Sequence, residues 1–238
     1  MQAAIVITGA AQRVGLALAK SFVSEGHKVI VSYRTLRPGI KELQQLGVVC
    51  IQADFEQQQD IDAFIVAVKN QCCSIRLLVH NASDWLAERS DLAPNIVFQR
   101  MMQIHANVPY QLTQALADYL KADGGGDVIA MTDFVAGSGS KKHVAYAASK
   151  AALENMVKSF ASLYSPTVKV NGIAPGLLMF NLDDDEAYKA KALSKSLLGN
   201  EPGAQVVIDS VAYLMNSTYL TGHILALDGG RSLAQKNT

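Results

Sequence analysis

Tyr146 and Lys150 are the pair of side chains in this sequence best suited to proton transfer. They lie four residues apart in a stretch with a helical pattern, and such positions share one face of a helix. A tyrosine hydroxyl is a candidate proton donor, and a nearby ammonium group favours the tyrosinate and lowers the tyrosine pKa toward working pH. The pair therefore predicts a site at which a proton moves to or from a substrate.

A glycine-containing segment at residues 8–15, Thr-Gly-Ala-Ala-Gln-Arg-Val-Gly, follows the first apolar run of the chain. Such a turn lets the backbone approach a pyrophosphate, and the start of the next helix supplies N–H donors and the positive end of its dipole. Gly9, Arg13 and Val14 are therefore expected to contact a dinucleotide cofactor.

The end of the second apolar run indicates which dinucleotide this is. An NAD site places an acidic residue there to bind the ribose 2′-hydroxyl, but residues 26–41 contain no Asp or Glu. The run ends instead in Ser32, Tyr33 and Arg34, with Arg37 close behind. Guanidinium groups match a 2′-phosphate, so we expect NADPH, with the arginine of the glycine segment also nearby. Surface arginines follow many strands, and for Arg37 an ordinary surface position is as good an explanation as cofactor binding.

Short apolar runs alternate with longer helical stretches along the chain, and this alternation predicts how the candidate residues are positioned. Strands are expected at residues 3–8, 28–33, 48–53, 75–80, 127–132, 168–174 and 223–227. Helices are expected at residues 14–24, 39–46, 60–70, 94–102, 109–121, 145–164, 183–198 and 204–216, with a turn at 123–126. Strands that are apolar throughout and separated by helices are typical of a parallel sheet covered on both faces. The prediction is an α/β, Rossmann-type, doubly wound sheet of about seven strands.

The organisation expected is one domain over residues 1–233, without repeats or linkers. A substrate loop is expected within residues 177–198, and residues 234–238 are expected to form a flexible tail. The acidic run at residues 183–186 is interpreted as a solvated helix start without chemistry.

Composition excludes several classes of protein. The 238 residues carry 21 Lys plus Arg and 21 Asp plus Glu, so neither nucleic acid nor a membrane is an expected partner. No apolar run approaches the roughly 20 residues of a membrane span, and no signal peptide is recognisable. Three cysteines and five histidines lack metal-ligand spacing. The expected protein is cytoplasmic and binds no metal.

Six motifs in order resemble those of the short-chain dehydrogenase/reductase family, and they cover essentially the whole chain. They are the glycine segment, Asp54, Asn81 with Ala82, Tyr146 with Lys150, residues 171–176 and residues 228–230. The resemblance implies that Asp54 contacts the adenine and that Asn81 and Ala82 line the cofactor. It further implies that Pro175 and Gly176 border the nicotinamide, that Lys150 holds the nicotinamide ribose beside Tyr146, and that the protein is a homotetramer.

Departures from the usual family pattern narrow the resemblance to its pteridine reductase branch. Arg13 replaces a small residue, and Asp133 replaces the serine that the family carries thirteen residues before the tyrosine. Ser83 follows Asn-Ala, Trp85 comes two residues later, and His105 replaces an asparagine. The resemblance implies NADPH-dependent reduction of 7,8-dihydropterins, best of dihydromonapterin and weakly of dihydrofolate, in tetrahydropterin biosynthesis and one-carbon metabolism.

The residues that differ from the usual family pattern are suited to binding a nitrogen-rich ring. The Asp133 carboxyl can accept from ring N–H groups or relay a proton to Tyr146, and partial burial would raise its pKa. Asp133 could instead only cap its loop. Trp85 is expected to stack on the pterin, although it could be an ordinary loop aromatic. Ser83 and the arginine of the glycine segment are expected to bond pterin or phosphate oxygens.

Three questions stay open at this level. His105 could support a water chain to the lysine or satisfy core hydrogen bonds, and Asn107 could take the place of the missing asparagine. The chain could reduce carbonyl substrates such as oxoacyl thioesters, against which Asp133 and Trp85 argue. It could also be a non-catalytic NADP-binding regulatory module, against which the intact Tyr146 and Lys150 argue.

Overall fold

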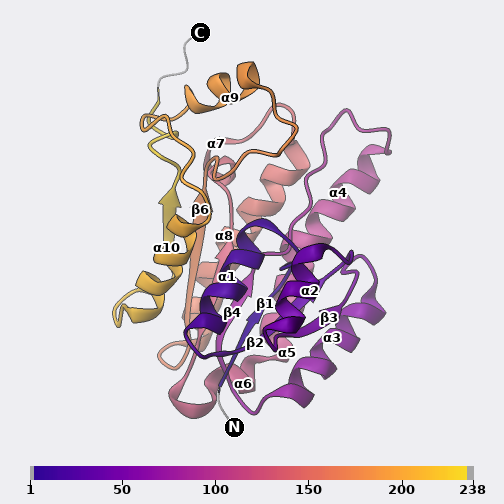
Figure 1. The fold of residues 1–238 in the computed structure, drawn as a ribbon, viewed down its shortest axis with the longest axis vertical. Helices are drawn as coiled ribbons and strands as arrows, with labels where there is room; N and C mark the ends of the chain where they lie inside the picture. The colour runs from indigo at the N-terminus through magenta and orange to yellow at the C-terminus, as the bar shows by residue number, and fades with distance from the viewer. Residues whose placement is uncertain (1–2, 235–238) are drawn as a thin grey trace.

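A twisted sheet of seven parallel strands forms the centre of the computed structural model, which describes residues 3–234 (Figure 1). The strands lie in the order β3-β2-β1-β4-β5-β6-β7. Their bounds are β1 Ala4–Ile7, β2 Lys28–Tyr33, β3 Val49–Gln52, β4 Ile75–His80, β5 Asp127–Met131, β6 Lys169–Pro175 and β7 Ile224–Leu227. Every neighbouring pair is parallel, which confirms the predicted doubly wound α/β fold.

The helices connect the strands over both faces of the sheet. Their bounds are α1 Arg13–Ser24, α2 Pro38–Gln45, α3 Gln58–Gln71, α4 Pro94–Met102, α5 Val108–Ala115, α6 Ala117–Lys121, α7 Val135–Ser138, α8 Val144–Tyr164, α9 Glu186–Leu193 and α10 Gln205–Asn216. A π-helix, η1, covers Gln103–Asn107, and a 3₁₀ turn, η2, covers Ala122–Gly124.

Each face of the sheet has its own apolar core. Helices α1, α2 and α10 bury Leu18, Ile40 and Val207 against one face. Helices α3, α5 and α8 bury side chains such as Phe64 and Val157 against the other. Strands buried on both faces must be apolar at every position, which explains their unbroken apolar runs.

The strand order reverses between β1 and β4, which are neighbours in the middle of the sheet. From β1 the chain adds β2 and β3 toward one edge, and from β4 it adds β5, β6 and β7 toward the other. In an open parallel sheet the loops diverge at this point and leave a crevice at the carboxyl ends of the strands. The loops after β1 and β4 contain the glycine segment and residues 81–85, so the fold brings these two predicted motifs together.

Two predicted helices are wrong in extent. The stretch 109–121 is two helices, because Leu116 leaves the helical region with φ −101° and ψ 5°. The predicted helix at 183–198 is shorter, since α9 begins after the cap residue Asp185, whose carboxylate accepts from the Tyr188 N–H at 2.6 Å. That capping agrees with the interpretation of the acidic run as a helix start.

The π-helix η1 and the short helix α7 were not predicted. In η1 the chain stays helical through residues where the sequence suggested a break, directly before Pro109. Proline has no N–H to offer the carbonyl of the fourth residue before it, and its ring crowds that carbonyl, so a wider turn is favoured. That carbonyl belongs to His105.

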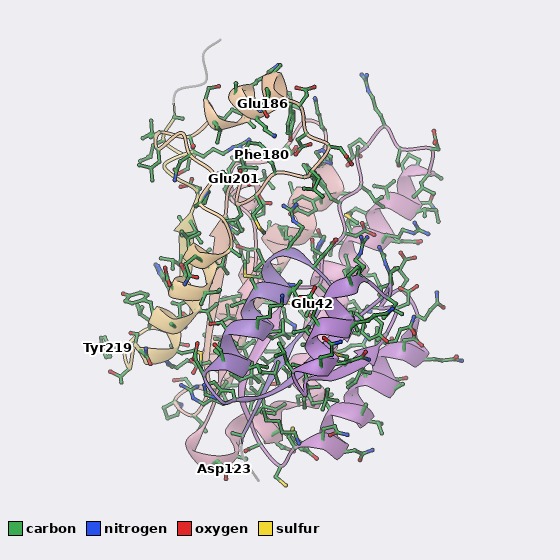
Figure 2. All side chains as sticks on the ribbon, in the orientation of Figure 1. Glu42, Asp123, Phe180, Glu186, Glu201 and Tyr219 are labelled. Atoms are coloured by element: carbon green, nitrogen blue, oxygen red, sulfur yellow. The ribbon has the colours of Figure 1, made fainter. Side chains whose placement is uncertain are left out.

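The predicted substrate loop extends from the carboxyl end of β6 to beyond α9, at one end of the molecule (Figure 1). Figure 2 shows Phe180, Glu186 and Glu201 at this end and Asp123 at the opposite end, and the Phe180 N–H donates to Glu201 Oε1 at 2.7 Å. Of the predicted tail, residues 235–238 lie outside the described residues.

Two kinds of feature are absent from residues 3–234. No helix there is long and apolar enough to cross a bilayer. Within the same residues, no group of three or more His, Cys, Asp or Glu side chains is placed to hold a metal ion.

Candidate active site

The glycine segment after β1 packs its backbone directly against the loop after β4. Gly9 has φ +71°, and a Cβ there would lie 2.7 Å from Ala82 Cα. A Cβ on Gly15 would lie 2.5 Å from the Gly9 carbonyl oxygen. Asn81 ties the two loops together by donating from Nδ2 to the carbonyls of Thr8 and Gly9 at 3.0 and 2.8 Å. The turn is therefore compact enough for a phosphate to approach its backbone, as the sequence predicted for Gly9.

Helix α1 begins directly after this turn, at Arg13. Gln12 precedes the helix with extended backbone and makes no side-chain cap. The N–H groups of an uncapped first turn are available to a ligand, and the helix dipole favours an anion there. The geometry therefore fits a pyrophosphate at the start of α1.

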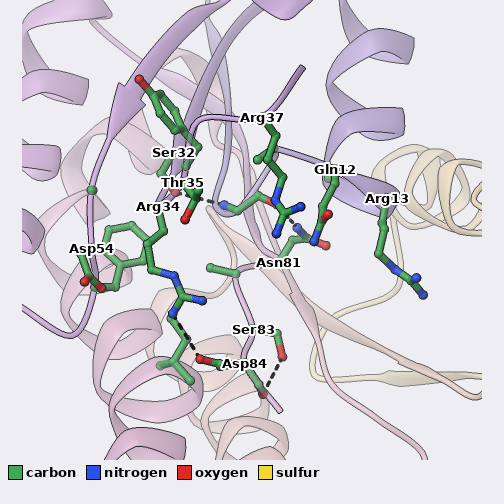
Figure 3. A pocket seen from close by; sticks show the side chains of 18 of the residues that line it. Gln12, Arg13, Ser32, Arg34, Thr35, Arg37, Asp54, Asn81, Ser83 and Asp84 are labelled. Atoms are coloured by element: carbon green, nitrogen blue, oxygen red, sulfur yellow. Dashed lines mark hydrogen bonds and ion pairs between the residues drawn. The ribbon is translucent and has the colours of Figure 1, made fainter. Parts of the chain in front are cut away.

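An open cleft of ≈ 540 Å³ runs from this turn across the ends of β2, β3 and β4 (Figure 3). Of the predicted residues it is lined by Gly9, Arg13, Val14, Ser32, Tyr33, Arg34, Asp54, Asn81, Ala82, Ser83 and Trp85. Its chemistry suits an extended dinucleotide, with uncapped amides at one wall and guanidinium groups at another.

Arg34 lies in this cleft at the point where β2 ends. Its Nη1 is 3.2 Å from Asp84 Oδ2 and 3.9 Å from Glu56 Oε1, and Figure 3 shows the first contact. Arg37 also lines the cleft, on the side of Gln12. A cationic rim without an acidic residue on β2 fits a 2′-phosphate better than a free ribose hydroxyl.

Arg13 points away from Arg34 and Arg37, toward the predicted substrate loop (Figure 3). Its guanidinium donates to Asn181 Oδ1 and to the Met179 carbonyl, both at 2.9 Å. The backbone of Arg13 is in the left-handed region, with φ +54°, a strained conformation for a residue with a side chain. In this geometry Arg13 lines the cleft and joins the cofactor turn to the substrate loop, and its expected bond to pterin or phosphate oxygens stays a prediction.

Tyr146, Asp133 and Lys150 meet where β5 ends beside α8. Tyr146 donates from its hydroxyl to Asp133 Oδ2 at 2.8 Å. Asp133 Oδ1 accepts from the Val135 N–H at 3.0 Å, so the carboxyl also caps α7. Lys150 donates from Nζ to the Met131 carbonyl at 2.8 Å. Asp133 therefore caps its loop and also contacts the tyrosine, and its role toward a substrate stays a prediction.

Burial dominates the protonation of these three groups. It raises the pKa of Asp133, as expected, and it lowers the pKa of Lys150 to about 8. Burial and then the Asp133 charge raise the pKa of Tyr146 well above its ordinary value. The expectation of a lowered tyrosine pKa is therefore wrong here, because desolvation and the neighbouring carboxyl both raise it. Tyr146 keeps its proton, as a proton donor must.

His105 is 1% exposed and lies between two serines. Its Nε2 is 2.7 Å from Ser83 Oγ, and its Nδ1 is 2.9 Å from Ser149 Oγ. Burial lowers the pKa of His105 to about 2, so its ring is neutral. Asn107 is exposed and donates to the Gln103 side chain, and it does not line the cleft, so it does not replace the missing asparagine.

Trp85 is 65% exposed at the edge of the cleft. Its ring centroid lies 4.6 Å from that of His143 and 6.2 Å from that of Tyr146. An exposed aromatic face this close to the tyrosine ring is available to a flat ligand, as the stacking hypothesis requires.

Pro175 and Gly176 lie at the carboxyl end of β6, beside β5 and β7. The Pro175 carbonyl accepts from the Phe134 N–H, and the Gly176 N–H donates to the Leu227 carbonyl. These two residues do not line the cleft as it stands, and neither do Tyr146, Lys150 and Asp133. Trp85 and Ser83 form the boundary between the cleft and the tyrosine.

Several lining residues were missed by the sequence analysis. Asp84, Glu56, Arg100 and Asn181 all line the cleft. Asp84 sits inside a motif already singled out, so an acidic residue opposite Arg34 could have been noticed. Asn181 comes from a distant loop, and nothing local in the sequence points to it.

Comparison with known proteins gives consistent matches. Residues 3–189 match the family described as short chain dehydrogenase. The chain is 50% identical over 231 residues to the dihydromonapterin reductase of Klebsiella pneumoniae subsp. pneumoniae, covering 96% of each protein. It is 48% identical over 234 residues to the dihydromonapterin reductase of Enterobacter sp. strain 638, covering 98% of each.

One solved structure extends the comparison to three dimensions. FolM alternative dihydrofolate reductase 1 from Brucella suis, in complex with NADP, superposes with a TM-score of 0.89 at 25% identity. The match covers 99% of this chain and 97% of that one.

Proposed function

The chain belongs to the short-chain dehydrogenase family, and from that premise we propose that it is an NADPH-dependent reductase of 7,8-dihydropterins. Dihydromonapterin is the best single substrate, and dihydrofolate is reduced more weakly. The observation that carries the proposal is the Tyr146–Asp133 hydrogen bond beside Trp85, in a chain half identical to dihydromonapterin reductases. The NADP in the Brucella structure supports the cofactor.

Reduction of the N5=C6 bond of a dihydropterin adds a hydride to C6 and a proton to N5. When bound, NADPH supplies the hydride and leaves as NADP⁺. The protein must hold the two rings face to face, exclude water and deliver the proton.

Tyr146 is the proposed donor of that proton. Because the Val135 N–H occupies Asp133 Oδ1, a proton on the carboxyl resides on Oδ2, which faces the tyrosine. A protonated Asp133 then donates to Tyr146 Oη and leaves the phenol hydrogen free to point at the substrate. Burial raises the pKa of Asp133, which favours this state.

Other residues are proposed to hold the two ligands. Asn81 and Ala82 line the cofactor, Asp54 contacts the adenine, and Arg34 with Arg37 takes the 2′-phosphate. Lys150 holds the nicotinamide ribose through Nζ, and Pro175 with Gly176 borders the nicotinamide. Trp85 covers the pterin on the side away from the nicotinamide, with Ser83 at its edge. Arg13 holds the substrate loop by its bonds to Met179 and Asn181.

The decisive experiment measures NADPH oxidation with dihydromonapterin, dihydrobiopterin and dihydrofolate, and repeats each reaction with NADH. Turnover of the dihydropterins with NADPH, and much slower turnover with NADH, is expected. Faster turnover of dihydrofolate than of any dihydropterin would keep the chemistry and reject the substrate order.

The same assay separates the alternatives. Turnover of oxoacyl thioesters without turnover of pterins would make the protein a carbonyl reductase. NADPH binding without turnover across both panels would make it a regulatory module.

The cellular setting is part of the proposal. A homotetramer in the cytoplasm would supply tetrahydropterins to one-carbon metabolism. An apolar pocket on α4, η1, α5 and α8, lined by Phe98, Met102, Tyr110 and Met156 among others, supports association through these helices.

A further inference from the structure

A hydrogen-bonded chain with His105 and Ser149 buried and Ser83 exposed joins the catalytic helix to the substrate edge of the cleft. Ser149 Oγ donates to the Tyr146 carbonyl at 2.7 Å. His105 Nδ1 lies 2.9 Å from that same Ser149 oxygen, and His105 Nε2 lies 2.7 Å from Ser83 Oγ. For each hydrogen-bonding group in this series, the number of hydrogens that it can donate is known.

Counting the hydrogens fixes the direction of each bond. A carbonyl oxygen only accepts, so the single hydroxyl hydrogen of Ser149 is used on Tyr146. Ser149 can therefore only accept from His105, which places the ring hydrogen on Nδ1. The Met101 carbonyl is a further acceptor for the ring. A neutral imidazole with hydrogen on Nδ1 has an unprotonated Nε2, so Ser83 must donate its own hydrogen to it.

Ser83 has two other hydrogen-bonding neighbours, the Asp84 carbonyl and the Tyr146 hydroxyl. The Asp84 carbonyl lies 3.4 Å from Ser83 Oγ, against 2.7 Å for His105 Nε2. Because the shorter contact takes the hydrogen, Ser83 has only lone pairs left for the cleft that it lines.

We propose that His105 is a specificity-determining positioning residue. Its Nε2 accepts a hydrogen bond from the Ser83 hydroxyl, so that Ser83 offers the substrate an acceptor and never a donor. A ligand that presents an N–H or amino group to Ser83 is bound, and one that presents a carbonyl oxygen meets a lone pair. The substrate half of this inference rests on the proposed function, because a pterin carries amino and ring N–H donors along its edge. The ring orientation does not rest on it.

Ring nitrogen NMR tests the orientation without any substrate. In ¹⁵N-labelled protein, the His105 signals are identified as those lost in His105→Gln. A protonated Nδ1 and an unprotonated Nε2, unchanged between pH 6 and pH 8, are expected. A protonated Nε2, or a ring that titrates in this range, would overturn the proposal even if dihydropterin turnover were normal.

Ligand binding tests the specificity. Calorimetry on the NADP⁺-loaded protein compares 6-hydroxymethylpterin with 6-hydroxymethyllumazine, in which a carbonyl oxygen replaces the amino group. The wild-type protein is expected to bind the pterin at least about tenfold more tightly, since an unpaired buried acceptor weakens binding by about that factor. Equal affinities would overturn the specificity role.

Two substitutions of His105 separate positioning from folding. Glutamine reaches the place of Nε2 and can accept from Ser83, whereas asparagine reaches only the place of Nδ1. His105→Gln is therefore expected to keep most of the pterin preference, and His105→Asn to reduce it to less than about threefold at a similar melting temperature. Equal preference in the two variants would contradict the role of Nε2. Lack of turnover with dihydropterins, in a protein that keeps the Nδ1–H ring, would reject the proposed function and leave the orientation standing.

Discussion

A carboxyl group that shares a hydrogen bond with a tyrosine hydroxyl can either receive the phenol hydrogen or supply one. Asp133 is buried beside Tyr146, and its raised pKa favours the protonated, supplying form at a higher pH than a carboxyl in water would. At the residue scale, the choice between these forms decides whether the tyrosine can act as an acid toward a ring nitrogen.

Replacement of Asp133 tests this choice. Asp133→Ser and Asp133→Asn are expected to lower kcat for dihydropterins by about 10²-fold, within the range for a lost proton-transfer group. Asp133→Ser is also expected to improve reduction of carbonyl substrates. Steady-state kinetics with both substrate classes is the measurement, and unchanged pterin turnover in Asp133→Ser would contradict the assigned role.

The pH profile of kcat gives a second test of Asp133. Since the protonated form is the active one and its pKa is raised, kcat is expected to fall as pH rises through that raised pKa. This limb should be missing in Asp133→Asn, whose residual rate is expected to be flat over the same range. A limb of equal position in both proteins would assign it to another group.

Burial of Lys150 lowers the stability of the protein, because an ammonium group loses its hydration when it is buried. The pKa of Lys150 is about 8 in the folded protein, against 10.5 for an ordinary lysine side chain. Below pH 8 both states are protonated and the folded state carries the whole cost of burial. Between pH 8 and 10.5 the unfolded state binds more protons, so stability rises with pH.

Lys150→Met is therefore expected to abolish activity and to raise stability at pH 7 by on the order of 1–2 kcal/mol, a few °C in Tm. Thermal unfolding at pH 7 and pH 10 is the measurement, and the gain should shrink at the higher pH. A lower Tm than wild type at pH 7 would show that the bond to Met131 outweighs desolvation.

At the scale of elements, the strands and the glycine turn were predictable because their causes are local. Strands that are covered on both faces show unbroken apolar runs, and Gly9 is needed wherever backbone approaches Ala82 so closely. The direction of Arg13 depends on Asn181, which is distant in the sequence, and the protonation of Tyr146 depends first on how deeply folding buries it. The π-helix η1 was only partly predictable, because Pro109 indicates an irregular helix but not the type of irregularity.

Pro109→Ala tests how η1 positions His105. Alanine restores an N–H that can bond the His105 carbonyl in α-helical fashion and so compete with the wider turn. A fall in kcat/KM of about tenfold, with a Tm within a few °C of wild type, is expected from displacement of a residue that orients the site. Pro94→Ala, at the start of α4 where no hydrogen bond is missing, is the matched control. Equal rates in both variants would contradict the link between η1 and the site.

At the scale of the whole molecule, the candidate residues lie at the carboxyl ends of β1 to β6, with Tyr146 and Lys150 on the adjoining helix α8. Helices α4, η1, α5 and α8 present the apolar pocket elsewhere. The sequence predicted the doubly wound parallel sheet. It could not predict this pocket, because side chains from four helical segments meet there only after folding.

Phe98→Asp is expected to convert the proposed tetramer into smaller species, since a carboxylate cannot be buried unpaired in an apolar contact. Light scattering coupled to size exclusion is the measurement. Val66→Asp, on the exposed side of α3, is the control that should leave the mass unchanged. A wild-type protein that is already monomeric would reject the assembly.

Asp84 joins the two halves of the cleft through one carboxylate. Its Oδ2 contacts Arg34, and its Oδ1 accepts from the Trp85 N–H at 2.9 Å. Whatever changes the arginine therefore also loosens the aromatic residue beside the tyrosine. If Arg34 and Trp85 have the roles proposed for them, preference for the coenzyme and preference for the substrate are epistatic traits in this protein, and a variant selected for NADH is expected to need a second change near Trp85 to recover its original substrate.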